Sequence, residues 1–217
     1  MGYIQLVEEI NSIKDERQRI NYIVNFVMNN IEYNYLFLDN SKVAKYYANN
    51  DPNSIVDFQD EKESLQFIQS LAKQLGLTDE YKNLVIEQYR GLKNKNEDIY
   101  FTRILPKVTS ATFENGILKQ GVCMDIANFV KKLCDDCDIA CKWILGDTGF
   151  MHKWNLIKFE GRWVNVDFTY AMYSRDRYKN YGKISPCSWL GITDERLRQL
   201  HPQRKWISLI DENGMIR

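Results

Sequence analysis

A short turn signal between two alternating segments constrains this chain more than any other feature. Residues 151–159 and 162–170 both mix β-branched and aromatic side chains with polar ones, and only Glu160 and Gly161 separate them. Two linking residues that end in glycine are typical of a tight β-hairpin turn. Residues 140–145 have the same strand-like character. The sequence therefore predicts three short antiparallel strands, two of them joined by a two-residue turn.

The hairpin also predicts which side chains are neighbours across it. Pairing starts with Phe159 opposite Arg162, and counting outward from there sets His152 opposite Thr169. Asp167 then lies diagonally across from His152 on the same face. Diagonal partners are roughly 7–8 Å apart at the backbone, a gap that a histidine and an aspartate can bridge with one hydrogen bond. The spacing predicts a His–Asp pair.

Cys123 stands where a helical pattern begins. Directly after Gly121-Val122-Cys123, apolar residues recur at helical spacing, at Ile126, Phe129, Val130, Leu133 and Cys137. A helix N-terminus and a nearby imidazolium both favour the thiolate, which is the reactive form of cysteine. The carboxylate of a His–Asp pair orients the ring and stabilises its protonated form. We therefore expect Cys123, His152 and Asp167 to act as nucleophile, base and orienting acid, with the Cys123 backbone N–H helping to stabilise an oxyanion.

The segments that carry these three residues resemble the bacterial transglutaminase-like superfamily, which has a papain-like fold. They are Gly121-Val122-Cys123, His152-Lys153-Trp154-Asn155 and Trp163-Val164-Asn165-Val166-Asp167-Phe168-Thr169, in the family's order of Cys, His and Asp. The resemblance is strongest over about residues 105–170, and weaker in residues 30–33 and 192–195. It implies an α+β fold in which a catalytic helix packs on an antiparallel sheet.

The resemblance also implies acyl transfer through a Cys-His-Asp triad, with no metal and no organic cofactor. We favour hydrolysis of a peptide or amide bond in a protein or peptide substrate, as in a cysteine peptidase or amidase. A protein-glutamine transglutaminase or a deamidase is the enzymatic alternative, because all of these share the acyl-enzyme. A non-catalytic binding module that retains the fold is an alternative of another class. Asp125, Ile126 and Lys153 depart from the family's usual glycine, tyrosine and alanine, which leaves the substrate open.

The N-terminal half has the pattern of a helical lobe. Residues 13–31 and 65–75 carry apolar side chains at helical spacing, and Thr78 is placed to cap a third helix. We expect a single domain over residues 1–217, in which about residues 54–92 form a helical insertion.

The overall composition limits the classes of partner. Lysine plus arginine and aspartate plus glutamate both number 29, so no net field attracts nucleic acid or an anionic membrane. No apolar run is long enough to span a bilayer, and the N-terminal residues lack the pattern of a signal peptide. Five cysteines, an odd number, lie between positions 123 and 187. We expect reduced thiols, a cytoplasmic location and no nucleic-acid or membrane partner. The oligomeric state is left open.

Further residues have competing interpretations. Trp154 is expected to lie beside the His–Asp pair, where it would either shield that hydrogen bond or pack in the core. Gly121 is a second possible lining residue. His201 has the context of a solvated histidine, and residues 196–205 that of a solvated basic face. Cys134, Cys137 and Cys141 are expected to be core thiols, because no second Cys or His pair follows at zinc-site spacing.

Overall fold

The computed structural model of the chain forms two compact units. It describes residues 1–48, 61–95, 104–147, 151–177 and 205–210. One unit comprises Met1–Tyr33 and Ser110–Arg217, and the other comprises Asn34–Thr109. The segment expected as an insertion, about residues 54–92, falls inside the second unit. Cys123, His152 and Asp167 all belong to the first.

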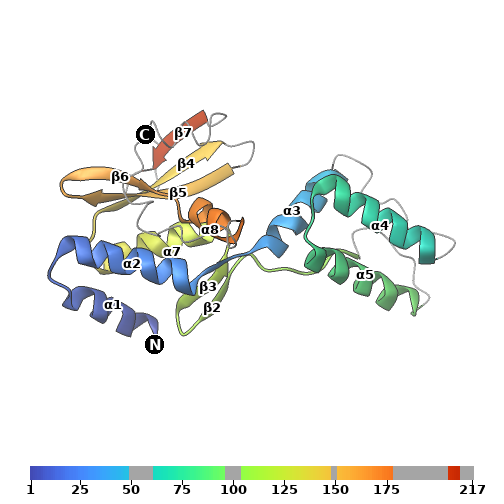
Figure 1. The fold of residues 1–217 in the computed structure, drawn as a ribbon, viewed down its shortest axis with the longest axis horizontal. Helices are drawn as coiled ribbons and strands as arrows, with labels where there is room; N and C mark the ends of the chain where they lie inside the picture. Colours follow the sequence, from blue (N-terminus) through green and yellow to red (C-terminus); the bar gives the residue numbers. More distant parts are fainter. Residues whose placement is uncertain (49–60, 96–103, 148–150, 178–204, 211–217) are drawn as a thin grey trace. The chain divides into compact units, whose positions relative to one another are not determined.

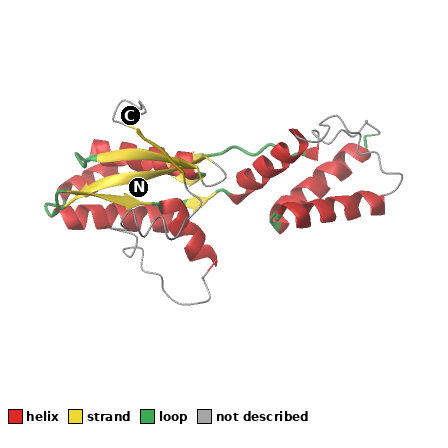
Figure 2. Cartoon of the chain, turned by 90° about the horizontal axis from the view of Figure 1, so that it is seen from above, coloured by secondary structure: helices red, strands yellow, loops and turns green. Residues whose placement is uncertain are grey.

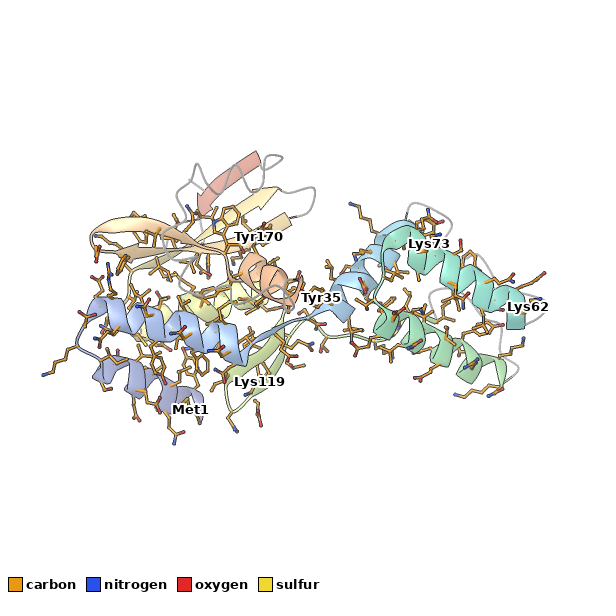
Figure 3. The ribbon with its side chains drawn as sticks, in the orientation of Figure 1. Met1, Tyr35, Lys62, Lys73, Lys119 and Tyr170 are labelled. Carbon is orange, nitrogen blue, oxygen red and sulfur yellow. The ribbon has the colours of Figure 1, made fainter. Side chains whose placement is uncertain are left out.

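The second unit is helical where it is described. It contains α3 (Tyr35–Ala48), α4 (Glu61–Leu75) and α5 (Asp79–Lys93), and Figure 3 labels Lys62 and Lys73 near the two ends of α4. Gly76 follows α4 with a φ of +60°, a conformation that glycine adopts without strain. The Thr78 hydroxyl accepts a hydrogen bond from the Tyr81 N–H at 3.3 Å and so caps α5. The helix predicted over residues 65–75 and the helix that Thr78 was predicted to cap are both confirmed.

The larger sheet of the first unit contains the predicted hairpin. Its strands are β4 (Cys141–Asp147), β5 (Met151–Phe159), β6 (Arg162–Val166) and β7 (Lys205–Ile210). They pair antiparallel in the order β6-β5-β4-β7. Phe159 pairs with Arg162, and Glu160 and Gly161 both have positive φ, at 48° and 77°. The two-residue turn and its register are confirmed.

The prediction that the last hairpin strand continues to Tyr170 is wrong. β6 ends at Val166, and α8 (Phe168–Arg177) begins two residues later. The Asp167 carboxylate accepts a hydrogen bond from the Tyr170 N–H at 3.1 Å, which caps this helix. His152 is therefore not paired with Thr169, which lies in α8, and its strand partner is Gly146 of β4.

A second, three-stranded sheet leads into the helix that carries Cys123. It consists of β1 (Glu32–Tyr33), β2 (Thr112–Glu114) and β3 (Ile117–Gly121), in the order β1-β3-β2. Asn115 and Gly116 turn the β2–β3 hairpin with φ values of 50° and 78°. An Asn-Gly pair is a strong hairpin signal, so this hairpin was readable from the sequence but was not predicted.

Helices pack against one face of the four-stranded sheet (Figures 1 and 2). α7 (Cys123–Asp136) packs directly on β4 and β5, and α8, α2 (Glu16–Asn30) and α1 (Tyr3–Ser12) lie on the same side of the sheet. Buried residues of this core include Leu6, Ile10, Ile20, Val24, Ile126, Phe129, Val130, Leu133, Ile157, Val166, Phe168 and Met172. The fold is α+β, as predicted. Within the described residues, every helix is too short or too polar to cross a membrane.

Candidate functional site

The start of α7 is shaped by three residues around Cys123. Val122 is the N-cap, and its backbone N–H donates to Asp125 Oδ2 at 3.1 Å. A Cβ atom on Gly121 would lie only 2.8 Å from the Asp125 Cβ, closer than side chains pack. Glycine at 121 therefore makes room for the carboxylate that holds the helix start. The helix then presents Cys123 as its first residue.

His152 and Asp167 form the predicted pair. His152 Nε2 is hydrogen-bonded to Asp167 Oδ2 at 2.8 Å, and the Asp167 side chain is fully buried. The other carboxylate oxygen, Oδ1, accepts the N–H of Tyr170, which Figure 3 labels on α8. Because the helix cap holds one oxygen, the second is fixed in position toward the ring. The end of β6 and the start of α8 together orient the histidine.

Trp154 supports the His152 ring. The two rings stack with their centroids 5.6 Å apart and their planes 22° from parallel. The Trp154 Nε1–H donates to Asn165 Oδ1 at 2.9 Å, which fixes the indole between neighbouring strands. Trp154 is only 1% exposed, so it packs behind the histidine and does not form an accessible wall.

The environment of Cys123 favours its thiolate. Burial is the largest single influence and raises the pKa of the thiol. A hydrogen bond to His152, the charge of that ring and the backbone N–H of Lys153 act the other way, and the net effect lowers the pKa. The position at the start of α7 favours negative charge as well. Cys123 remains partly exposed.

The complementary effect appears at His152. Burial alone would lower the pKa of this imidazole, but the charge and hydrogen bond of Asp167, followed by those of Cys123, raise it to about 9. A ring with this pKa is protonated at neutral pH. The arrangement is therefore an imidazolium that is hydrogen-bonded to the Asp167 carboxylate and lies beside a thiol of lowered pKa.

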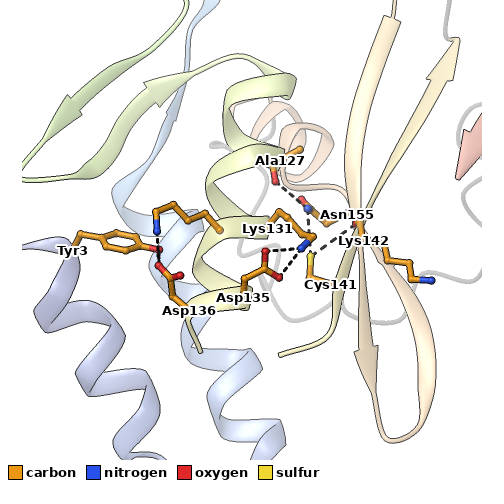
Figure 4. A network of polar contacts seen from close by, with 9 residues as sticks. Tyr3, Ala127, Lys131, Asp135, Asp136, Cys141, Lys142 and Asn155 are labelled. Carbon is orange, nitrogen blue, oxygen red and sulfur yellow. Dashed lines mark hydrogen bonds and ion pairs between the residues drawn. The ribbon is translucent and has the colours of Figure 1, made fainter. Parts of the chain in front are cut away.

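Two supporting residues were not identified from the sequence. Asp125, noted only as a departure from the family, caps α7. Asn155 donates from Nδ2 to the Ala127 carbonyl at 3.0 Å and so ties β5 to α7; Figure 4 shows this contact. A carboxylate three residues after an N-cap is a recognisable capping signal. Nothing in the sequence pattern marks Asn155, because its partner is a main-chain atom on another element.

The other candidate residues lie apart from this group or outside the description. Cys134, Cys137 and Cys141 are buried free thiols, as predicted. Burial raises the pKa of Cys137 to about 11. In the part of the chain that the structure describes, no three His, Cys, Asp or Glu side chains are arranged to hold a metal. His201 and residues 196–204 lie outside the described residues.

Comparisons of the chain with models of protein families, with curated proteins and with solved structures find no match.

Proposed function

We propose that this protein is a thiol-dependent acyl-transfer enzyme that hydrolyses a peptide or amide bond. The Cys123 thiolate attacks the carbonyl carbon, and the C–N bond breaks as His152 gives its proton to the departing amine. Water then adds to the thioester, its proton passes to His152, and the acid product leaves as the thiol sulfur is released. Nε2 of His152 is held by Asp167, so Nδ1 is the nitrogen that exchanges protons.

The observation that carries this proposal is that His152 interacts with both Asp167 and Cys123. Its ring is bonded to Asp167 at 2.8 Å and also lowers the pKa of the Cys123 thiol. Three residues far apart in the sequence are thus linked through the His152 ring, which would exchange protons while Asp167 orients it. If the His152–Asp167 pair served stability alone, it would not need a partly exposed thiol, Cys123, beside the histidine.

The same residues support a papain-like, transglutaminase-like core as the finer description of the fold. A helix that begins at a cysteine, an antiparallel sheet that carries the histidine, and an aspartate at the end of the next strand follow the family's chain order. We further propose action on a protein or peptide in a reducing, cytoplasm-like compartment, since four described cysteines are free thiols. The balanced charge argues against a nucleic-acid partner.

Selective labelling tests whether Cys123 is a nucleophile. Iodoacetamide at neutral pH, followed by peptide mass spectrometry, should modify Cys123 well before the other four cysteines. The His152→Ala variant should lose that preference. Equal labelling of all five cysteines in the folded protein would refute the enzyme and favour a non-catalytic binding module.

A second assay separates hydrolysis from amine transfer. A pool of glutamine-containing peptides is incubated with the protein and a primary amine, with Cys123→Ala as the control. If water resolves the acyl-enzyme, as we expect, the products should be new peptide termini or glutamine converted to glutamate. Incorporation of the amine that outruns hydrolysis would identify a crosslinking enzyme.

A further inference from the structure

Lys153 is a buried lysine next to the histidine of the site. The residue is 9% exposed, although it carries an ammonium group. Its Nζ donates to Asn128 Oδ1 of α7 at 2.6 Å and lies 3.8 Å from the centroid of the Trp143 ring. Both partners are neutral. A buried cation normally has an anion to offset the loss of hydration.

The neighbouring lysine shows the usual arrangement. Lys131 of α7 lies 5.9 Å from the centroid of the same Trp143 ring, and it contacts both oxygens of Asp135, at 2.6 and 2.5 Å (Figure 4). Asp135 is therefore already paired. Within the described residues, Lys153 forms no salt bridge with a carboxylate.

Cys123 is the residue of the site whose negative charge can offset the charge of the Lys153 ammonium. The backbone N–H of Lys153 bonds the cysteine sulfur, so the two residues lie together. Burial lowers the pKa of the Lys153 ammonium, and the charge of Cys123 is the influence that raises it. Coulombic attraction is mutual, so an ammonium that the thiolate stabilises must stabilise the thiolate in return. Asp167, the other acid of the site, is committed to His152 and Tyr170.

We propose that the Lys153 ammonium is a second cation of the site, and that its counter-anion is the Cys123 thiolate. This inference rests on the proposed function, because it assigns a role to a residue beside the proposed nucleophile. Lys153 acts through Cys123 and does not transfer a proton itself. Its charge does not depend on the His152 proton, so the Cys123 thiolate has a cationic partner both before it attacks and when it is released from the thioester.

The test is the pH profile of Cys123 alkylation by iodoacetamide in the full chain, which needs no substrate. Lys153→Met keeps an unbranched apolar stem and removes the charge. It should move the midpoint of the profile to higher pH and slow alkylation below that midpoint, because an opposite charge favours the thiolate. Lys153→Arg keeps the charge and should restore most of the rate. Lys142→Met is the matched control, because Lys142 also lies over an indole, 4.9 Å from the Trp163 centroid. It should leave the profile unchanged.

Two results would overturn the proposal. One is a folded Lys153→Met protein with the wild-type profile, and the other is an equal effect of Lys142→Met. If Lys153→Met fails to fold, Asn128→Asp replaces it. A carboxylate at the 2.6 Å position should pair with the ammonium in place and offset its charge, so alkylation should slow, and an unchanged rate counts against the proposal. A wild-type thiol with an ordinary pKa would instead contradict the proposed function, so the two failures differ.

Discussion

Replacing Asp167 with asparagine removes the negative charge from the His152 ring while it preserves the local shape. Asparagine is as good a helix N-cap as aspartate, so the bond to the Tyr170 N–H and the start of α8 should survive. The variant therefore separates the electrostatic role of the carboxylate from its structural one. Asp15→Asn is the matched control, since Asp15 caps α2 through the Gln18 N–H at 2.8 Å, far along the chain from the site.

The magnitude follows from the causes of the raised pKa. The pKa of His152 rises from 6.5 to about 9, against the opposing effect of burial, and the charge of Asp167 is the largest upward cause. Removing that charge and weakening the hydrogen bond should lower the pKa by about one unit or more. One unit corresponds to about 1.4 kcal/mol between the protonated and neutral rings.

The effect on Cys123 has two opposing parts. The negative charge of Asp167 raises the pKa of the thiol directly, so its removal favours the thiolate. Loss of the imidazolium has the opposite effect, and the hydrogen bond and charge of His152 both outweigh the direct influence of Asp167. Near and above the lowered His152 midpoint, where the ring loses its charge, alkylation of Cys123 should therefore become slower in Asp167→Asn than in the wild type.

The assay is an NMR titration of the histidine ring protons. The chain has two histidines, so His201→Gln assigns the signals. Wild-type His152 should titrate near pH 9, Asp15→Asn should not alter this, and Asp167→Asn should titrate at lower pH. The raised pKa stabilises the fold fully below pH 6.5, and this stabilisation is lost as pH rises through 9. A His152 midpoint unchanged by Asp167→Asn would refute the reasoning.

Two substitutions test the supports of the site by urea unfolding. Gly121→Ala forces a Cβ to 2.8 Å from the Asp125 Cβ and should lower the free energy of unfolding by about 1–3 kcal/mol. Gly91→Ala, where a Cβ meets nothing within 4 Å in helix α5, should instead raise it by about 0.5–1 kcal/mol; equal effects would contradict the argument. Trp154→Phe deprives the buried Asn165 carbonyl of its indole donor and should cost about 1–3 kcal/mol. A loss below about 0.5 kcal/mol would show that this bond is not important.

Local patterns were sufficient to predict two of the elements around the site. The two-residue turn at Glu160-Gly161 and the helix that opens at Cys123 follow from signals within a few residues. Strand parity also identified His152 and Asp167 as neighbours, and they are hydrogen-bonded. Parity succeeded because β5 and β6 pair in register as far as Val166.

The error at Thr169 has a clear physical cause. Residues 163–169 alternate like a strand, and the pattern does not show that Asp167 caps a helix. A capping side chain changes the backbone direction at once, whereas alternation is recognised only over several residues. The Lys153 environment was also beyond sequence reasoning, because Asn128 and Trp143 come from other elements.

The pH dependence of Cys123 alkylation in the wild-type protein tests the central claim most directly. Rates at a series of pH values, followed by peptide mass spectrometry, give the midpoint of the reactive thiolate. The account predicts a midpoint below the ordinary value of 9, because His152 lowers the pKa of this thiol, and a higher midpoint in His152→Ala. A wild-type midpoint at or above 9, or one that His152→Ala leaves unchanged, would contradict it.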